Sequence, residues 1–574
     1  MGAKDLQGRP VAFPVLDARP SRGGAQLEVP RTSEGVWAPG RRRLTAGLVL
    51  TVTLVAFESL AISTVMPVVA DELGGLGLYG WVFSGFFLGS LLGIVVAGQL
   101  ADQRGTRFPF VVGLVCFTIG LVVGASAQSM GMLVAGRVAQ GFGAGVIPAV
   151  AYVSVGRVYP SELRPRVFAV FSSAWVIPGL VGPAAASTLA DVASWRAVFG
   201  TLLPLVAIAA AMTLPALTDR PVATPAEAKP AAGPPPHAAD RDDSASADAE
   251  LRDRHDASAP VAAEGGRHDA SAPVAADRDD SARADAELRN GGGPAHLDRN
   301  DGRGPGGAER DRPLWALVLV VGTAMVLAGL GAPGSPVVGA ALVVGGGLAA
   351  VRAFLRLVPP GTVRLAAGLP AAVAVRGILT LAFFGADAYV SLAVTDARGA
   401  STRLAGAALT ACTLTWTAGS WIQQRVIADR GPRWLVRRGF LFVAAGVAGL
   451  LIVLTSVPPA LAVVAWAVGG LGMGIAYGPL SVTALGLAEP GREGEATASL
   501  QLTDVLGVSM GTGLAGVFVA LGEGRGWTVG SSLTVAFSVT LVVALAGVLA
   551  AGRLPAPSPT DPRTASSPVP TPRH

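Results

Sequence analysis

Charged residues are scarce in this chain of 574 residues. They make up only 14% of the sequence, whereas 51% of the residues are hydrophobic and the mean hydropathy is +0.53. Because soluble proteins carry charge on about 25% of their residues, this composition excludes a soluble globular protein. It indicates a polytopic membrane protein. The 75 glycines agree with that class, since membrane helices associate through small residues that let their backbones approach.

Cysteine and histidine are rare as well, with 2 and 5 residues. Cys116 and Cys412 both lie inside apolar runs, so neither a disulfide framework nor a metal site is expected. His255 and His268 fall in an acidic polar segment and are expected to be solvated. The net charge of +5 is explained by arginines in cytoplasmic loops, so no nucleic-acid partner is expected.

Three segments lack long apolar runs. Residues 1–43 are polar and rich in Pro, Gly and Arg, which favours a disordered cytoplasmic arm without a signal peptide. Residues 218–313 contain no Phe, Trp, Tyr or Ile and cannot bury enough apolar surface to offset the entropy of ordering. We expect a disordered, low-complexity cytoplasmic linker there, and a disordered Pro-rich cytoplasmic tail at 553–574.

The remaining sequence consists of apolar runs long enough to span a membrane, which takes about 20 residues. About fourteen such runs predict transmembrane helices, near 44–69, 79–99, 108–127, 130–156, 167–189, 196–217, 314–331, 336–352, 371–395, 403–422, 436–456, 459–486, 496–520 and 528–551. The seventh and eighth, which are short and rich in glycine, have the least certain boundaries.

Arginines alternate between the loops in the way that a membrane topology requires. Arg41 to Arg43, Arg104 and Arg107, and the arginines at 352–364 and 425–438 all fall on one side, whereas opposite loops such as 125–129 carry no charge. Positive loops face the cytoplasm, so both termini are predicted to be cytoplasmic. The expected all-α architecture is a six-helix bundle at 44–217, an inserted helix pair at 314–352 and a second six-helix bundle at 353–552.

A short charged stretch between the second and third runs carries a recognisable motif. Gly98, Leu100, Asp102, Arg104, Gly105 and Arg107 closely resemble the signature loop of the major facilitator superfamily, and Asp429 to Arg433 weakly echo it in the second half. The resemblance implies two bundles that alternate access to a central site. It also implies a conformational role for this loop, with Asp102 and the arginines latching helix ends in one state.

Two further stretches are similar to motifs of the same superfamily. Gly136 to Ala144 resembles its arginine motif, which places Arg137 inside the membrane. Pro178, Gly179, Gly182 and Pro183 resemble the antiporter motif that is associated with exporters. The spacing departs by one residue at the first glycine, and Ala186 and Ser187 replace the terminal glycine pair.

The first run contains Glu58, nine residues before Pro67, where drug:proton antiporters of this superfamily typically have an aspartate. Fourteen spans with an inserted central pair also resemble one antiporter subfamily. At 1.5 Å per residue, Glu58 lies about 21 Å from the cytoplasmic start of its helix and Arg137 about 10 Å below the outer end of its own. The two are therefore at similar depth, and we expect Glu58 to be a protonation switch that Arg137 modulates. The alternative is a static ion pair that fixes helix register.

Two more acids lie within apolar runs. Asp387 follows Phe383 and Phe384 and precedes Tyr389, and this group of aromatic residues with one carboxylate could bind an apolar cation. Asp504 follows Gln501 in the thirteenth run. Each is a candidate for substrate or proton binding, or else a hydrogen-bonded structural group.

The favoured function is a proton-coupled exporter of small amphipathic or cationic molecules, and not an enzyme. It would work as a monomer in the plasma membrane, with the proton gradient as its energy source and no cofactor. One alternative keeps the fold but imports sugars, peptides or other metabolites. Another is a membrane-embedded transferase, which the short outer loops without histidine disfavour.

Overall fold

The computed structural model describes residues 36–39, 41–160, 163–174, 176–217, 311–331, 335–489 and 492–556. Every regular element in these ranges is helical. The predicted arm, linker and tail lie almost entirely outside the described residues. We call the helix ends that carry the arginine-rich loops cytoplasmic and the opposite ends outer, following the distribution of positive charge.

The first half of the protein runs from α1 to η2. Its elements are α1 (Arg42–Leu73), η1 (Leu76–Leu78), α2 (Tyr79–Arg104), α3 (Arg107–Ala125), α4 (Met130–Val158), α5 (Arg164–Ser173), α6 (Val176–Val192), α7 (Arg196–Gly200), α8 (Leu202–Thr213) and η2 (Leu214–Ala216).

The inserted pair and the second half follow after residue 311. Their elements are α11 (Arg312–Leu330), α12 (Pro336–Leu357), η4 (Thr362–Arg364), α13 (Leu369–Asp387), α14 (Val390–Thr395), α15 (Thr402–Val453), α16 (Leu461–Gly486), α17 (Glu493–Arg525), α18 (Val529–Ala550) and η5 (Ala551–Arg553).

Each predicted apolar run overlaps one of these helices or a consecutive pair of them, and two of the runs fall in the same helix, α15. Within the described ranges, twelve helices are long and apolar enough to cross a membrane. One of them, α15, has 52 residues and bends at Gly431, whose φ of 72° lies in the left-handed region that favours glycine. It therefore covers two of the predicted runs, and the count of fourteen crossings stays a prediction.

Several outer loops end in residues that cap the next helix. The hydroxyl oxygens of Ser129, Ser401 and Thr528 accept hydrogen bonds from backbone N–H groups three residues on, at 3.3, 3.3 and 3.2 Å. Such side chains satisfy donors that a helix N-terminus leaves unpaired. These short polar loops thus fix where α4, α15 and α18 begin.

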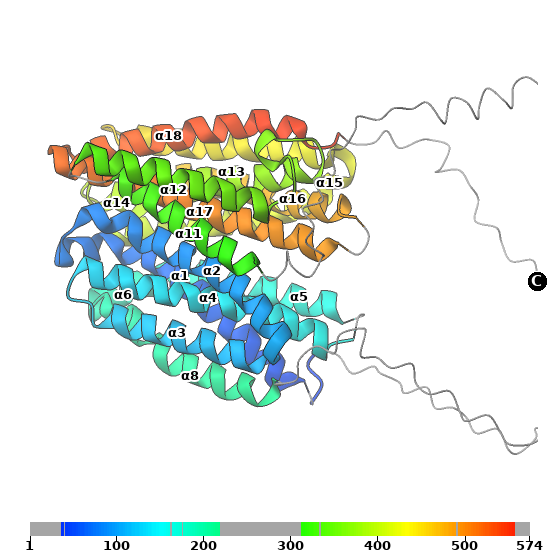
Figure 1. Cartoon of the computed structure of the whole chain (residues 1–574). Coiled ribbons are helices and arrows are strands. Elements are labelled where there is room, and N and C mark those ends of the chain that lie inside the picture. The colour runs from blue at the N-terminus through cyan, green and yellow to red at the C-terminus, as the bar shows by residue number, and fades with distance from the viewer. Residues whose placement is uncertain are drawn as a thin grey trace, which may run out of the picture. The chain divides into compact units, whose positions relative to one another are not determined.

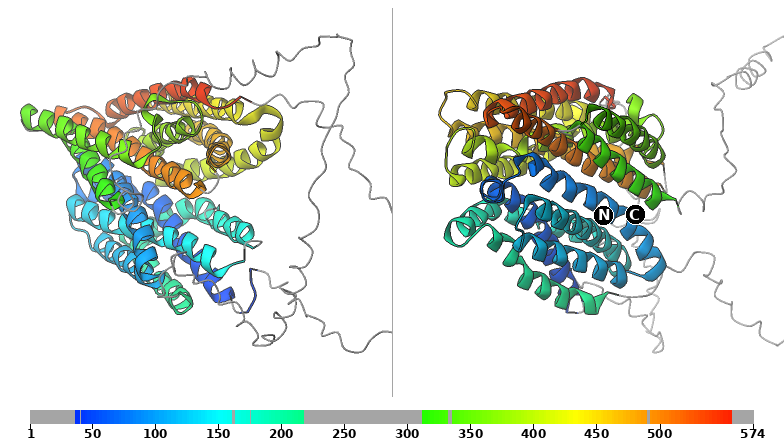
Figure 2. Two further views of the ribbon diagram at one scale, coloured as in Figure 1. Left: turned by 45° about the vertical axis from the view of Figure 1, so that its right-hand side comes forward. Right: turned by 60° about the vertical axis from the view of Figure 1, so that its left-hand side comes forward.

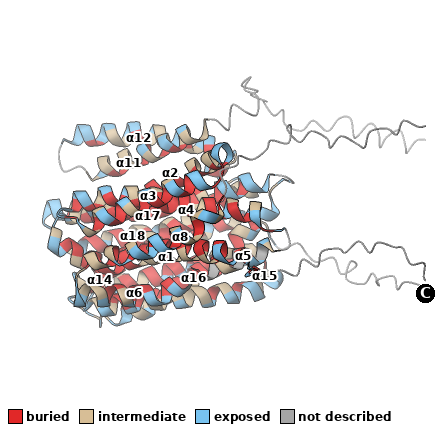
Figure 3. Ribbon diagram, turned by 90° about the horizontal axis from the view of Figure 1, so that it is seen from below, coloured by how far each residue is buried: buried red, intermediate tan, exposed pale blue. Residues whose placement is uncertain are grey.

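The two halves lie side by side, with α1 to α8 in one and α13 to α18 in the other, as Figures 1 and 2 show. They meet where α2 packs on α17 and α6 packs on α15. The inserted pair lies against α17, since Gly513 faces Leu327 of α11. Buried residues concentrate between the helices, while α12 is largely exposed, as expected for a helix that faces lipid (Figure 3).

The seam between α2 and α17 is tightest near the outer end. A methyl group added to Gly80 would lie 2.6 Å from the Cα of Gly516, so only glycine fits on either side. Hydrogen bonds also cross this seam from Gly77 N–H to a Glu523 oxygen at 2.6 Å and from the Ser509 hydroxyl to the Ser84 carbonyl at 3.2 Å. The two halves are therefore in direct contact on the outer side.

This close approach gives a first prediction. Gly516→Ala should disfavour the structure in which the outer side is closed, because its new methyl group overlaps Gly80. We expect increased labelling of outer-side cysteines placed along α2 in the variant. Gly524→Ala on the same helix is the matched control, since no atom lies within 4 Å of its added methyl group. Equal labelling of the two variants would contradict the prediction.

Candidate functional site

Glu58 and Arg137 meet in the interior of the first half. Their side chains are 1% and 2% exposed, and a guanidinium nitrogen of Arg137 on α4 donates to Oε1 of Glu58 on α1. The similar depth expected from helix geometry is thus observed as a direct ion pair. Charge at this depth is costly unless it is paired, so the contact accounts for two ionisable residues on apolar helices.

Arg137 is held by more than its carboxylate partner. Its Nε donates to the carbonyl of Val82 at 3.1 Å, its Nη1 donates to Oε1 of Gln140 at 2.7 Å, and its guanidinium lies 4.1 Å from the ring centroid of Phe86. In contrast, Oε2 of Glu58 is buried without a hydrogen-bond partner among the described residues. The guanidinium is thus held by four contacts, whereas the described residues give this carboxylate oxygen none.

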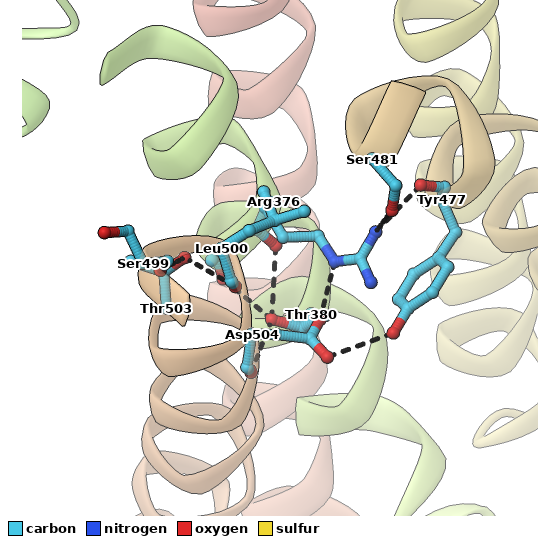
Figure 4. A network of polar contacts seen from close by, with 9 residues as sticks. Arg376, Thr380, Tyr477, Ser481, Ser499, Leu500, Thr503 and Asp504 are labelled. Carbon is cyan, nitrogen blue, oxygen red and sulfur yellow. Dashed lines mark hydrogen bonds and ion pairs between the residues drawn. The ribbon is translucent and has the colours of Figure 1, made fainter. Parts of the chain in front are cut away.

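A second buried charge pair lies in the other half (Figure 4). Nε of Arg376 on α13 donates to Oδ1 of Asp504 on α17 at 2.7 Å, and the hydroxyl of Tyr477 on α16 donates to the other oxygen at 3.0 Å. The guanidinium also donates to the Tyr477 carbonyl at 2.8 Å and lies over the ring of Tyr477. This network joins three helices around one aspartate.

Asp387 occupies a different setting from Asp504. It is the last residue of α13 and accepts a hydrogen bond from the indole N–H of Trp466 at 2.8 Å. No ion pair neutralises it among the described residues. The ring of Phe383 stacks on Trp466 with centroids 4.9 Å apart and meets Trp416 edge-on at 5.5 Å. A carboxylate with only a neutral partner thus lies beside a continuous aromatic surface.

The other aromatic candidates extend this surface in two directions. Phe384 faces Phe87 of the first half, with centroids 6.4 Å apart, and so contributes to the seam. Tyr389 is completely buried against Tyr79, and its hydroxyl donates to the carbonyl of Thr512 at 2.7 Å. Gln501 is half-buried one turn before Asp504. The sequence grouped Phe384 and Tyr389 with Asp387, and the structure places Tyr389 where the two halves meet on the outer side.

The charged signature loop links the cytoplasmic ends of α2 and α4. A guanidinium nitrogen of Arg157 donates to the Ala101 carbonyl at 3.0 Å and lies 4.0 Å from the carboxylate of Asp102. Arg104 lies over the ring of Phe108 at 4.7 Å, and Gly105 turns the chain with φ 75°. Gly98 has open space beside it, and Arg107 begins α3. The latching role of this loop stays a prediction.

The residues that resemble the antiporter motif lie on α6, where it contacts α1 and α15. Pro178, Gly179, Gly182 and Pro183 are all buried. A methyl group on Gly179 would lie 2.1 Å from Thr413 of the second half, and Gly182 faces Phe57 of α1. The motif is therefore part of the packing between the two halves.

Sequence reasoning missed several residues of these sites. Arg376 lies within the ninth apolar run, so the rule that selected Glu58 would also have selected it. Trp466 and Tyr477 are different, because nothing in their local sequence distinguishes them from ordinary helix residues. Gln140 lies within the arginine motif, but the motif does not show that its amide oxygen accepts a hydrogen bond from Arg137. Only the packing of α4 and α16 against their neighbours reveals their partners.

The fold and the paired intramembrane charges define a polytopic helical membrane transporter built from two halves. Residues 48–511 match the family model of the Major Facilitator Superfamily, and the chain belongs to that family. It is a transporter of small-molecule substrates.

The comparisons with individual proteins agree. A probable multidrug-efflux transporter of Mycobacterium tuberculosis is 25% identical over 508 residues, which cover 86% of this chain and 90% of the relative. The multidrug transporter protein MdtP of Bacillus subtilis is 29% identical over 169 residues, which cover 29% of this chain and 31% of that protein.

Solved structures show the same fold at low sequence identity. A POT family transporter in complex with 5-aminolevulinic acid has a TM-score of 0.56 and 12% identity, with 91% of this chain and 98% of that chain covered. A D-xylose-proton symporter has a TM-score of 0.50 and 14% identity, with 90% and 98% covered.

The Arg376 network gives a prediction about stability. Asp504→Leu alone should destabilise the protein by about 3–5 kcal/mol, because it leaves the guanidinium buried without a counter-charge. Adding Arg376→Met should recover most of this loss, since apolar residues of similar size often replace a buried pair at little cost. Thermal unfolding in detergent measures both. A double variant no more stable than Asp504→Leu would contradict the role of the pair.

The outer side gives a prediction about pH. Asp396 follows α14, and burial together with the nearby charge of Asp71 on α1 raises its pKa from 3.8 to about 6. The folded structure therefore binds this proton more tightly than the unfolded chain. The stabilising effect of protonation is present below about pH 4 and is lost as the pH rises through about 6.

We expect the wild type to gain thermal stability between pH 7 and pH 5, and Asp396→Asn should reduce this gain. Asp429→Asn, at an exposed position just before the bend in the middle of α15, is the matched control and should leave that gain intact. Unfolding midpoints at the two pH values provide the measurement. An unchanged gain in the Asp396 variant would show that this carboxylate does not titrate as described.

Proposed function

We propose that this chain is a proton-coupled exporter of small amphipathic or cationic compounds in the plasma membrane, and that it works by alternating access. The observation that carries the proposal is the buried Glu58 carboxylate. One of its oxygens is paired with Arg137, and the other is buried with no hydrogen-bond partner in the part of the chain that the structure describes. A group in this setting has two alternative ways to be neutralised, by the guanidinium or by a proton.

Protonation of Glu58 would change more than one residue. Once the carboxylate is neutral, no anion balances the charge of Arg137. Its remaining contacts are the Val82 carbonyl, the Gln140 amide oxygen and the ring of Phe86. Relief requires another anion or a rearrangement of α1 against α4. Proton binding and helix movement are therefore energetically linked, which is what a proton-driven transporter needs.

The substrate side of the proposal rests on Asp387. Its carboxylate has a neutral hydrogen-bond partner in Trp466, which stacks on Phe383 with both rings buried. The neighbouring rings of Phe384 and Trp416 are only half-buried, and aromatic rings attract cations. Asp504 is less suited to this role because Arg376 and Tyr477 already satisfy it. In this scheme an apolar cation binds at Asp387 and a proton binds at Glu58, and the protein carries the two in opposite directions. The names of the multidrug-efflux relatives support the same substrate class.

The decisive variant is Glu58→Gln. It keeps the size and much of the hydrogen bonding of the side chain but cannot gain or lose a proton. In everted vesicles with an imposed pH gradient, we expect at least a tenfold loss of gradient-driven uptake of a lipophilic cation, with substrate exchange retained at zero gradient. Full gradient-driven uptake in this variant would disprove the coupling role of Glu58.

Glu72→Gln is the matched control, since Glu72 lies on the same helix but pairs with Arg196 in a half-exposed position at its outer end. We expect it to transport normally. The same vesicles also test the alternative of a facilitator, because a facilitator would ignore the pH gradient in the wild type. A symporter would reverse the direction in which the gradient drives the substrate.

A further inference from the structure

An open cavity of about 470 Å³ lies in the middle of α15, on the cytoplasmic side of the protein, at the bend at Gly431. Its lining consists of four arginines, one tryptophan and one leucine, namely Arg430, Arg433, Trp434, Arg437, Arg438 and Leu441. None of these residues belongs to the charge pairs or the aromatic surface of the proposed transport site.

Helix geometry explains why these residues gather. Trp434, Arg437, Arg438 and Leu441 are spaced by three or four residues and share one face of the helix. The guanidinium carbons of Arg430 and Arg438 lie 5.4 and 5.3 Å from the centre of the Trp434 ring. The indole is 37% exposed, so the cavity opens away from the protein.

The four arginines of the cavity have no carboxylate partner among the described residues. Arg492, on the same side of the protein, shows the usual alternative, because Glu489 and Glu495 hold it on both sides at 2.9 and 2.8 Å. Like charges this close on one helix repel each other. The cavity is therefore electrostatically suited to an anion.

The adjoining surface indicates what kind of anion. Leu441 and Phe442, one turn further into the membrane, are 43% and 37% exposed and face the region of the acyl chains. Tryptophan is enriched at the boundary between headgroups and hydrocarbon, and the cytoplasmic leaflet carries anionic lipids. A ligand that satisfies both parts of this surface has a negatively charged head and apolar tails.

We propose that the cavity lined by Arg430, Arg433, Trp434, Arg437 and Arg438 binds the phosphate headgroup of an anionic phospholipid from the cytoplasmic leaflet. The planar guanidinium groups hydrogen-bond phosphate oxygens in pairs and stack on the indole at the same time. The acyl chains lie along Leu441 and Phe442. The lipid neutralises the four arginines and anchors the second segment of α15 beside its bend.

Native mass spectrometry of the full-length protein with added phosphatidylglycerol or phosphatidylcholine tests this site. We expect the wild type to retain phosphatidylglycerol at least tenfold more tightly than phosphatidylcholine. The variant R430Q/R433Q/R437Q/R438Q should lose this preference. The control R364Q/R425Q/R492Q/R553Q removes the same charge from exposed cytoplasmic arginines outside the cavity and should keep it. If both variants lost the preference for phosphatidylglycerol equally, the preference would come from the overall positive charge of the cytoplasmic side and the proposal would be overturned.

Two further arms identify the occupant. Inorganic phosphate that displaces the lipid at equal concentration would overturn the proposal, because the site would then recognise a soluble anion. A second possible occupant is the acidic segment 218–313 of the same chain. If this segment were protected from protease in phosphatidylcholine nanodiscs in the wild type but not in the glutamine variant, the segment and not a lipid would bind the cavity, and the proposal would be overturned. Trp434→Leu keeps all four charges and should weaken phosphatidylglycerol retention several-fold, which tests the site even where the glutamine variant does not fold.

Discussion

Much of this structure depends on the ion pair between Glu58 on α1 and Arg137 on α4, two apolar helices on which neither charge can face lipid. Glu58 and Arg137 are each too costly to leave alone in a membrane, so α1 and α4 must approach at one depth and in one rotation. Gln140, Phe86 and the carbonyl of Val82 then fix the guanidinium. The same constraint operates in the second half, where Arg376 brings α13, α16 and α17 together around Asp504 and Tyr477.

Glycine residues let the helices that carry these charge pairs pack closely against their neighbours. Gly89 and Gly141 leave no room for a methyl group between α2 and α4, and Gly80 with Gly516 does the same between the halves. Small residues let membrane helices gain packing energy without a hydrophobic driving force between them. Among the described residues, hydrogen bonds and not an ion pair cross the glycine seam between α2 and α17, whereas Asp191 on α6 and Arg403 on α15 form an ion pair of 3.3 Å between the halves.

The sequence was sufficient for the helical fold and for the Glu58–Arg137 contact, because hydropathy, arginine distribution and helix rise depend on local composition and spacing. The sequence did not predict which side chains on other helices form hydrogen bonds with Asp387 and Asp504, because those partners depend on how the helices pack. Trp466 reaches Asp387, and Tyr477 reaches Asp504, only through the crossing of α16 over α13 and α17. Tyr389 was grouped with Asp387 by proximity along the chain, but α13 ends between them and turns the phenol toward Thr512. Arg376 was visible in the sequence and was overlooked.

Both buried ion pairs are electrically neutral units. Moving one elementary charge across the membrane potential involves about 2.3 kcal/mol per 100 mV. Because Glu58 moves with Arg137 and Asp504 moves with Arg376, rotation of either half carries no net charge from these four residues through the field. The membrane voltage therefore acts on the charges that the protein binds and releases and on Asp387, which has no ionic partner among the described residues, but not on these two pairs. For the proposed exchange of protons against substrate, the electrical signal of a transport cycle would measure the imbalance between their charges together with any movement of Asp387.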